Sequence, residues 1–528
     1  MNLFTNLLKG PTGKQWQLIG PSPHHGICLP LSSLHTENSC GIGEILDLIP
    51  LIDWVQSIEM DVIQLLPLND SGTDCSPYNA ISSCALNPIY LALSALPYLE
   101  EYPDLVAKLN DFKSFNTTPR VDYKTVLEKK MEWLFLYFEK TGTVITKDPA
   151  FHQFVADNPW LEPYALFKLL KNTLKWEPWQ EWAQEFKTPD AKEYALLVQE
   201  NWEGLCFYIA LQHLLFEQLT TVKNYATEKK VNLMGDIPIL ISPDSADVWH
   251  DPSIFDLSME SGAPPDMYIK EGQNWGFPIY NWEEMEKRHY ELWKRRLSCA
   301  ERFFHIYRID HVVGFFRIWA MPKGKSPRDG TFVPQDESLW QPQGEKLLKM
   351  MIKAAPSLLP IGEDLGITPD STHETLIDLG ICSTKVMRWE RKWKEDYRFI
   401  PIEEYHPISM TTVSTHDSEP LSLWWKTSPK EAMAFAAFKK WEYTPILTQE
   451  QRQEILFDSH HSSSIFHVNP LQEYLAYFPE LVSSNPEEER INIPGKILPT
   501  NWTYRFIPSI RDLQNNLLLK EFMRKIHV

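Results

Sequence analysis

Several short apolar segments of this chain end directly before an acidic residue, and this repetition limits the folds that the chain can adopt. The pairs are residues 304–309 before Asp310, 358–362 before Glu363, 410–416 before Asp417 and 231–235 before Asp236. Core packing gives no reason for charge at these positions, whereas parallel α/β barrels and doubly wound sheets collect their functional groups at the carboxyl ends of their strands. The pattern therefore favours a parallel α/β architecture over a series of unrelated helix caps.

The length of the chain, 528 residues, exceeds the roughly 250 residues of a bare α/β barrel. Short apolar runs alternate with helical patterns at both ends of the chain, but the region from 99 to 224 has long amphipathic stretches and few strand candidates. We therefore predict an α/β fold, a (β/α)8 TIM barrel with helical insertions. The predicted parts are residues 1–98 as the first part of the barrel, 99–224 as a mostly helical insertion, and 225–528 as the remainder with a lid loop at 262–282.

Composition and charge exclude several classes of partner. A formal net charge of -19 disfavours nucleic acid, because binding to phosphates draws on clustered Lys and Arg. No stretch approaches the length of apolar sequence that spans a bilayer, and the N-terminal residues do not have the pattern of an export signal. Seven cysteines without a C-x-x-C pair indicate a reducing compartment. We expect a cytoplasmic protein that binds neither nucleic acid nor membrane.

Motifs for metals, nucleotides and serine nucleophiles were not found. The histidines lack H-E-x-x-H spacing, and no EF-hand loop is present. Residues 324–326 resemble the end of a phosphate-binding loop, but Trp319 occupies the place of its first glycine. No G-x-S-x-G elbow occurs. We therefore expect neither a metal nor a cofactor.

Two segments carry aromatic residues where a core stripe is not expected. In residues 272–282, Trp275 is flanked by Gln273, Asn274 and Gly276, so we expect its indole on a loop that can close. Tyr78 follows the strand predicted to end near residue 68, which puts it at the same end of the barrel. Exposed rings of this kind suit the apolar face of a sugar, and we predict that Tyr78, Trp275 and the neighbouring Gln273 bind substrate.

Taken together, these and other motifs resemble those of the amylomaltases, the 4-α-glucanotransferases of the α-amylase superfamily, over nearly the whole chain. The motifs are residues 29–34, 41–43, 64–68, 76–78, 87–88, 235–239, 244–249, 262–266, 272–282, 308–311, 362–366, 415–417 and 501–502. Residues 281–285 and 314–319 are similar to the cytosolic plant-type subgroup, without its starch-binding modules. Only 53 residues separate Asp310 from Glu363, so the large insertion of the plant enzymes is missing. Residues 383–386 depart from the family pattern, which would have Gly-Met before the basic residue.

The resemblance implies a double displacement with Asp310 as nucleophile, Glu363 as general acid/base and Asp417 as a carboxylate that stabilises the transition state. Residues i and i+2 share one face of a strand, so we expect Arg308 beside Asp310, where its charge keeps the nucleophile ionised. Glu363 needs a raised pKa to donate a proton, and its neighbours in sequence bring no cation. The resemblance also implies that His416 binds sugar hydroxyls and that Asp236 supports the substrate site near the nucleophile.

These expectations describe a 4-α-glucanotransferase. It would transfer α-1,4-glucan segments from maltooligosaccharide or glycogen-like donors to glucose, maltooligosaccharide or glycan acceptors, with retention of configuration. One alternative is an α-glucan hydrolase of the same fold, because the carboxylates alone do not distinguish transfer to sugar from transfer to water. A non-catalytic glucan-binding protein is a second alternative, but it has no need of the three carboxylates. Acceptor preference, donor length and oligomeric state stay open.

Overall fold

The computed structural model describes residues 3–265 and 269–528, and its centre is a sheet of eight parallel strands arranged in chain order. The strands are β1 (His24–Leu29), β2 (Val62–Leu65), β3 (Asn232–Ile237), β8 (Ile306–Ile309), β11 (Leu359–Gly362), β12 (Ser383–Val386), β13 (Ser409–Thr412) and β14 (Phe466–Pro470). β1 pairs with both β2 and β14, and a parallel bridge from Ile361 to Cys382 joins β11 to the residue before β12. The sheet closes on itself, and the predicted TIM barrel is confirmed.

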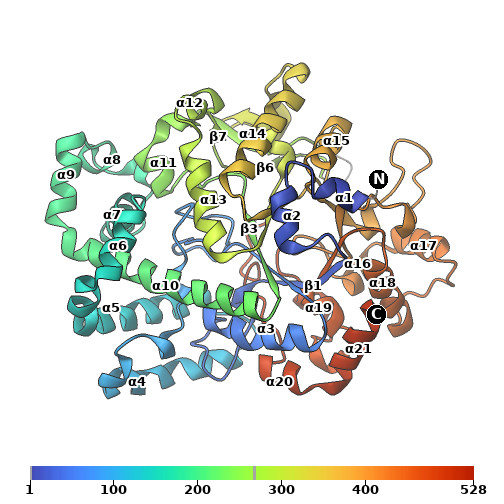
Figure 1. Ribbon diagram of the computed structural model, residues 1–528, viewed down its shortest axis with the longest axis horizontal. Coiled ribbons are helices and arrows are strands. Elements are labelled where there is room, and N and C mark those ends of the chain that lie inside the picture. The colour runs from blue at the N-terminus through green and yellow to red at the C-terminus, as the bar shows by residue number, and fades with distance from the viewer. Residues whose placement is uncertain (1–2, 266–268) are drawn as a thin grey trace.

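Helices surround most of the barrel (Figure 1). Those that lie between successive barrel strands or follow the last one include α3 (Leu48–Ser57), α10 (Trp202–Glu228), α13 (Glu291–Phe303), α14 (Trp340–Ala354), α15 (Asp370–Leu379), α16 (Leu421–Thr427), α17 (Pro429–Phe438), α18 (Gln449–His460), α19 (Leu471–Leu475), α20 (Ile510–Asn515) and α21 (Leu517–His527). The strands are buried on both faces, which is why they read as short apolar runs in the sequence.

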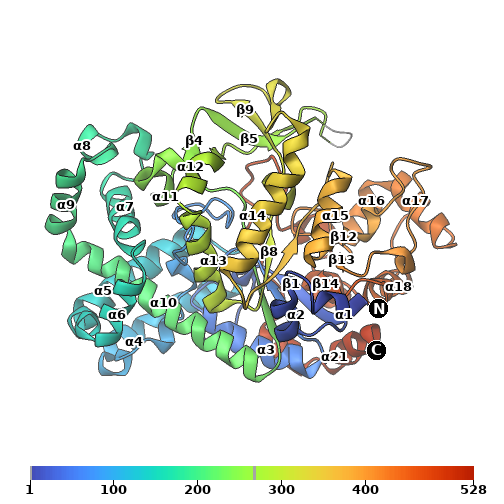
Figure 2. The ribbon, with the colours of Figure 1, turned by 45° about the horizontal axis from the view of Figure 1, so that its top comes forward.

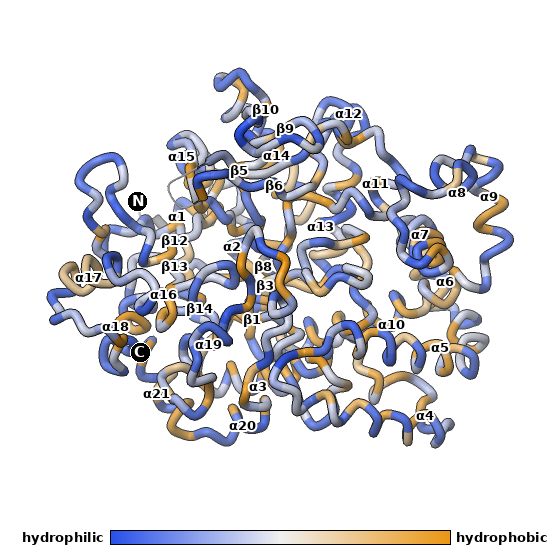
Figure 3. Tube along the Cα trace, turned by 180° about the vertical axis from the view of Figure 1, so that it is seen from behind, coloured by the Kyte–Doolittle hydropathy of each residue, from blue (hydrophilic) through white to orange (hydrophobic). Residues whose placement is uncertain are grey.

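One end of the barrel interior is apolar and closed. Val62, Met234, Ile306 and Phe466 form a buried cluster with Trp16, which belongs to α2 (Gly13–Ile19) near the N-terminus after α1 (Leu3–Leu7). The indole of Trp16 donates to the carbonyl of Gly380 at 2.9 Å. The tube in Figure 3 shows hydrophobic residues along the barrel strands and hydrophilic ones along many outer loops. Polar side chains of the interior therefore gather at the other end, beyond the carboxyl ends of the strands.

The connection from β2 to β3 contains most of the additional helices, which lie together at one side of the molecule (Figures 1 and 2). They are α4 (Pro103–Lys108), α5 (Tyr123–Lys147), α6 (Pro149–Asp157), α7 (Leu161–Thr173), α8 (Gln184–Lys187) and α9 (Ala191–Glu200), followed by α10. Buried ion pairs fasten this region to the barrel loops, for example Lys168 with Asp70 at 2.7 Å. The predicted end of the insertion, residue 224, lies inside α10, so the insertion and the barrel share this helix.

A small antiparallel sheet, in the order β10-β9-β5-β6, is built from the connections that follow β3 and β8. Its strands are β5 (Met259–Ala263), β6 (Gln273–Asn274), β9 (Ile318–Pro322) and β10 (Thr331–Val333). A separate short antiparallel pair consists of β4 (Phe255–Asp256) and β7 (Ile279–Tyr280). The remaining helices of these connections are α11 (Ala246–His250) and α12 (Trp282–Lys287). Connections after barrel strands lie at the carboxyl face, so this sheet brings the predicted lid loop to that face. Residues 266–268 of that loop are outside the described residues.

Two strand ends differ from the sequence prediction. β3 continues through Asp236 to Ile237, so Asp236 lies within the strand instead of after it. β13 ends at Thr412, and Asp417 follows it on a loop five residues later. The apolar pattern locates the strands, but hydrogen bonding to the neighbouring strands decides where each one ends.

Candidate active site

Arg308 is the centre of the charged groups at the carboxyl end of the barrel. It pairs in register with Asp236 on the neighbouring strand β3. Its Nη1 atom donates to both carboxylate oxygens of Asp236 at 2.8 Å and lies 3.0 Å from Oδ1 of Asp310. The side chain of Asp236 is fully buried and also accepts the hydroxyl of Tyr78 at 2.7 Å. The expected contact between Arg308 and Asp310 is present, and Asp236 fixes the guanidinium that makes it.

Glu363 lies on the other side of the same guanidinium. Its Oε2 atom is 3.8 Å from Nη2 of Arg308, so a cation does approach it, from the neighbouring strand and not from its own neighbours in sequence. Oε2 accepts the backbone N–H of His311 at 2.8 Å, and Oε1 accepts that of Leu365 at 2.9 Å. Burial raises the pKa of Glu363 to about 7, against the Arg308 charge and with help from Asp310.

The backbone next to Asp310 is strained in a way that serves Glu363. His311 has a φ of +48°, a left-handed conformation that is uncommon outside glycine. This turn directs the His311 N–H toward Oε2 of Glu363. The residue after the first acid therefore holds the second acid in position, and the two are linked through both Arg308 and the backbone.

Asp417 is the most exposed of the three predicted carboxylates, with 46% of its side chain accessible. Its Oδ1 accepts the side-chain amide of Asn492 at 2.6 Å, and its Oδ2 lies 3.3 Å from Nε2 of His416. Although burial acts in the opposite direction, His416 and Asn492 lower the pKa of Asp417 to about 2. The pKa of His416 is raised in turn, because the charge of Asp417 outweighs the effect of its burial. Asp417 is therefore ionised over the whole neutral range.

An aromatic group lies beside His416. The ring of Tyr78 stacks on the imidazole, with centroids 5.3 Å apart and an interplanar angle of 15°. Trp502 contacts both rings, at 5.5 Å from Tyr78 and 5.8 Å from His416. These three residues come from the loops after β2, β13 and β14. Tyr78, His416 and Trp502 thus form one aromatic group at the carboxyl end of the barrel.

Trp275 lies next to the residue that follows Asp310. Its ring meets His311 edge to face, at a centroid distance of 5.0 Å. The indole N–H donates to Oε1 of Gln273 at 3.1 Å, so the two predicted sugar contacts of this loop are joined to each other. The backbone of Trp275 is fixed by a hydrogen bond to Ser261 at 2.9 Å. The side chain is half-buried.

Buried charges support the loop that carries Asp417. Glu473, which is fully buried, accepts the Ser414 hydroxyl and the Leu421 N–H, and Arg452 pairs with its other oxygen. The loop is thereby tied at both sides of Asp417. Removal of one member of such a network leaves an unpaired buried group, which is strongly destabilising.

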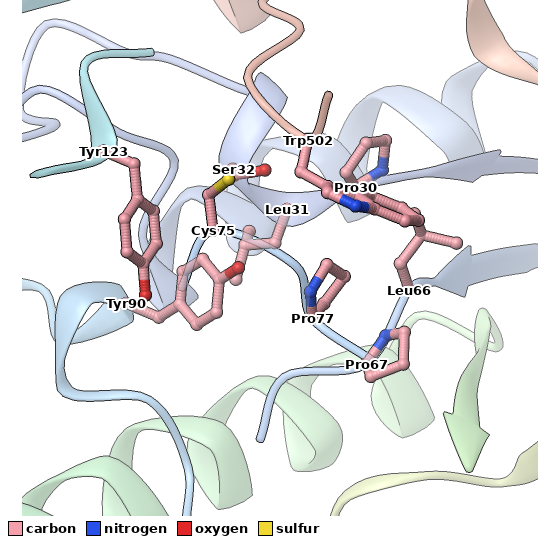
Figure 4. Close-up of a pocket in the computed structure, with 10 residues that line it drawn as sticks. All are labelled: Pro30, Leu31, Ser32, Leu66, Pro67, Cys75, Pro77, Tyr90, Tyr123 and Trp502. Carbon is pink, nitrogen blue, oxygen red and sulfur yellow. The ribbon is translucent and has the colours of Figure 1, made fainter. Parts of the chain in front are cut away.

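Figure 4 shows a small cavity that Trp502 helps to line. Its lining residues are Pro30, Leu31, Ser32, Leu66, Pro67, Cys75, Pro77, Tyr90, Tyr123 and Trp502. Its volume of about 10 Å³ is room for one water molecule and not for a sugar. We assign it to the packing that supports Trp502.

Among residues 3–265 and 269–528, no group of three or more His, Cys, Asp or Glu side chains has a geometry that could hold a metal ion. Over the same residues, no helix is both long and apolar enough to cross a membrane.

Known proteins resemble this chain over nearly its whole length. A model of the 4-alpha-glucanotransferase family matches residues 29–509 of the chain. The chain belongs to the 4-α-glucanotransferase family. It is 46% identical to the 4-alpha-glucanotransferase of Chlamydia pneumoniae over 528 residues, which are 100% of this chain and 99% of that protein. The 4-alpha-glucanotransferase DPE2 of Oryza sativa subsp. japonica is 36% identical over 307 residues, covering 56% of this chain and 32% of the rice protein.

A 4-α-glucanotransferase fold is also found among solved structures. The amylomaltase of Streptococcus agalactiae, solved in complex with acarbose, superposes with a TM-score of 0.80 over 96% of this chain and 98% of that one, at 23% identity. The family match and the full-length relative show that the protein is an enzyme that transfers glycosyl groups, and the structural match shows that it has the amylomaltase fold.

Sequence reasoning missed two residues that contact the predicted site residues. Asn492 binds Asp417 from 75 positions away, and Trp502 was noted only as part of a motif. Both lie in the segment after β14, which has no acidic residue directly behind its strand. The signal that could have found Trp502 is the dipeptide Asn501-Trp502 itself; we see no comparable signal for Asn492.

Proposed function

We propose that this enzyme transfers α-1,4-linked glucan segments by a retaining double displacement. Donors are maltooligosaccharides or glycogen-like glucans, and acceptors are glucose, maltooligosaccharides or glycans. The observation that carries the proposal is the shared position of two carboxyl groups of opposite character around Arg308. Asp310 is paired at 3.0 Å with the guanidinium, while Glu363 has a pKa of about 7. Retaining enzymes of this type use one ionised and one protonated carboxyl, about 5 to 5.5 Å apart.

In the first step, a carboxylate oxygen of Asp310 attacks the anomeric carbon of the donor. The bond from this carbon to the glycosidic oxygen breaks, and Glu363 gives its proton to that oxygen, so the leaving sugar departs neutral. The product is a glucosyl ester on Asp310 with Glu363 ionised. Asp417, which carries a negative charge at neutral pH because its pKa is about 2, stabilises the positive charge that develops on the sugar ring.

In the second step, the acceptor hydroxyl replaces the departed sugar. Glu363 accepts the proton of this hydroxyl. The hydroxyl oxygen attacks the anomeric carbon, and the ester bond to Asp310 breaks. The configuration is retained after two inversions, and both carboxyls return to their starting states. A pKa near neutrality suits Glu363 to both roles, because the group must gain and lose a proton in each cycle.

The side chains around the carboxylates provide the sugar contacts in this proposal. Tyr78 and His416 form one wall, and Trp275 with Gln273 forms another. Aromatic faces hold the apolar side of a pyranose, and polar groups at their edges bind its hydroxyls. Asp236 acts through Arg308, since its own carboxylate is covered. All seven cysteines are free thiols, which supports a cytoplasmic location.

Incubation with maltotriose alone tests this function. A transferase should yield glucose together with a ladder of maltooligosaccharides longer than the substrate, because a sugar intercepts the glucosyl ester. Products limited to glucose and maltose would identify a hydrolase. Binding of maltotriose without turnover would identify a glucan-binding protein. The Asp310→Asn variant, in which the nucleophile is removed and the shape retained, is the matched control.

A further inference from the structure

The connection between β12 and β13 is unlike the other connections of the barrel. All of its residues, 387–408, are described, and they form two 3-10 turns where an α-helix would be expected. Its central part is a hairpin of residues 391–399, in which the N–H of Lys392 donates to the carbonyl of Arg398 at 2.9 Å. Because it starts at the carboxyl end of β12, the hairpin lies on the face of the barrel that carries the active site.

Two large aromatic side chains of this hairpin face solvent. Trp393 is 38% exposed and Tyr397 is 58% exposed. Their rings meet edge to face at 6.2 Å. The indole N–H of Trp393 donates to the carbonyl of Trp389 at 2.9 Å, and the N–H of Tyr397 donates to Lys392 at 3.1 Å. Two aromatic rings that are fixed by hydrogen bonds and exposed to solvent provide an apolar surface that a ligand can contact.

The hairpin is joined to the loop that follows Glu363. Lys394 at its tip contacts both carboxylate oxygens of Asp370, at 2.9 and 2.8 Å. Asp370 is the first residue of α15, which packs against β12 (Figure 2). Between Glu363 and Asp370, Ile367 is 66% exposed. Three exposed apolar side chains thus come from the connections that follow β11 and β12, and we call Ile367, Trp393 and Tyr397 the rim platform.

The charges of the hairpin favour a neutral ligand. Lys394 is paired with Asp370, and Arg398 lies 3.6 Å from Asp396. A third cation, Arg391, lies over the Trp393 ring at 5.7 Å from its centroid and over the Phe399 ring at 3.8 Å. Three cations of the hairpin are thus held by carboxylates or by aromatic rings and offer little to an anion. The platform instead presents apolar faces next to polar groups, which is the chemistry that suits pyranose rings.

We propose that the rim platform binds a distal part of a long α-1,4-glucan whose reacting bond lies at Glu363. This inference rests on the proposed function and extends it, because it assigns to the enzyme a preference for long glucans beyond the sugars next to the scissile bond. We expect the platform to hold sugar units beyond the three of maltotriose. A comparison of glycogen with maltotriose therefore distinguishes an effect of the platform from an effect of the catalytic residues.

The test compares glycogen with maltotriose in a variant that carries Trp393→Ala and Tyr397→Asn. Asparagine is chosen because residue 397 has a φ of +60°, which asparagine tolerates. Loss of two stacking contacts should raise the KM for glycogen about threefold to tenfold, with less than about a twofold change in kcat/KM for maltotriose. Trp202→Ala is the matched control, because Trp202 is 44% exposed on the helical insertion. It should change neither value.

Native electrophoresis in gels that contain glycogen measures binding without turnover. The parent enzyme should be retarded, and the double variant should migrate faster than the parent at the same glycogen concentration. An unretarded parent, an unchanged KM for glycogen in the double variant, or an equal loss with both substrates would each overturn the platform. A parent that is retarded by glycogen but does not disproportionate maltotriose would refute the proposed function and leave the platform standing.

Discussion

Among single residues, Glu363 has surroundings that act on its pKa in opposite directions. A guanidinium at 3.8 Å and two backbone N–H donors all favour its ionised form, yet burial and the nearby Asp310 raise its pKa to about 7. Arg308 lies closer to Asp310 and Asp236 than to Glu363, so its charge is shared mainly with them. Two carboxyls near one cation thus lie in different environments, which differ in burial and in distance from the guanidinium.

The pKa of Glu363 predicts a pH profile. The first step needs Glu363 protonated, and this form is lost as the pH rises through about 7. Asp417, with a pKa of about 2, stays ionised throughout. We expect kcat/KM for maltotriose to fall above about pH 7, with no loss attributable to Asp417 between pH 4 and 7. Rates measured across pH 4 to 9 check this. A basic limb that appears already below pH 5 would mean that burial does not dominate at Glu363.

At the scale of elements, the hairpin formed by β5 and β6 brings Trp275 to the side of His311. Gly272, at a φ of +72°, allows the close approach of this segment to Ala263, where a Cβ would lie 2.8 Å from the carbonyl oxygen. The β5–β6 hairpin and Gly272 therefore determine where the indole of Trp275 lies.

Removal of this indole should change the fate of the glucosyl ester. Trp275→Ala weakens the hold on the acceptor and admits water, while Asp310 and Glu363 stay in place. We expect the ratio of transfer products to hydrolysis products from maltotriose to fall about threefold to tenfold. Trp393→Ala is the control, since maltotriose does not extend to the rim platform. An unchanged ratio would make Trp275 a packing residue and leave acceptor binding to other groups.

The elements also show what the sequence could and could not predict. Asp310 and Glu363 could be found from the sequence, because a strand that is buried on both faces and ends in a charge is visible as an apolar run followed by an acidic residue. Asn492 and Glu473 leave no such pattern: each acts on the loop around Asp417 from a distant segment, and only the closed barrel brings them together. The same holds for Arg308 and Glu363, whose contact depends on the pairing of β8 with β11.

At the scale of the whole molecule, the face opposite the active site contains a cluster of histidines. His25 of β1 stacks on His467 of β14 at 4.8 Å, and its Nδ1 lies 2.9 Å from that of His460 in α18. His527 of the C-terminal helix α21 is 5.2 Å from His25. Burial first, and then mutual repulsion, lowers the pKa of His25 to about 3 and holds that of His460 well below its ordinary value. Burial lowers the pKa of His467 to about 4. His24 differs, since Asp61 raises its pKa in spite of burial.

This cluster predicts acid sensitivity. In the folded protein, His25, His460 and His467 stay neutral. In the unfolded chain the same histidines bind protons below about pH 6.5. The unfolded state then binds more protons, so stability is lost as the pH falls from about 6.5 toward 4. We expect a thermal midpoint several degrees lower at pH 5 than at pH 7.5, and a smaller difference in His527→Gln. Calorimetry at both pH values measures this. Equal midpoints would show that the cluster does not couple folding to protonation.

The central claim is that Asp310 forms a covalent bond to the sugar, and trapping of this intermediate tests it most directly. A maltotriosyl α-fluoride needs no acid to leave, while breakdown of the ester needs Glu363 as base, so the Glu363→Gln variant should accumulate the glycosyl enzyme. Mass spectrometry of the digested protein then locates the attached sugar. We expect a maltotriosyl group on the peptide that contains Asp310, and no such group in a variant that also carries Asp310→Asn. A sugar attached to a different carboxylate, or inverted product without any attached sugar, would contradict it.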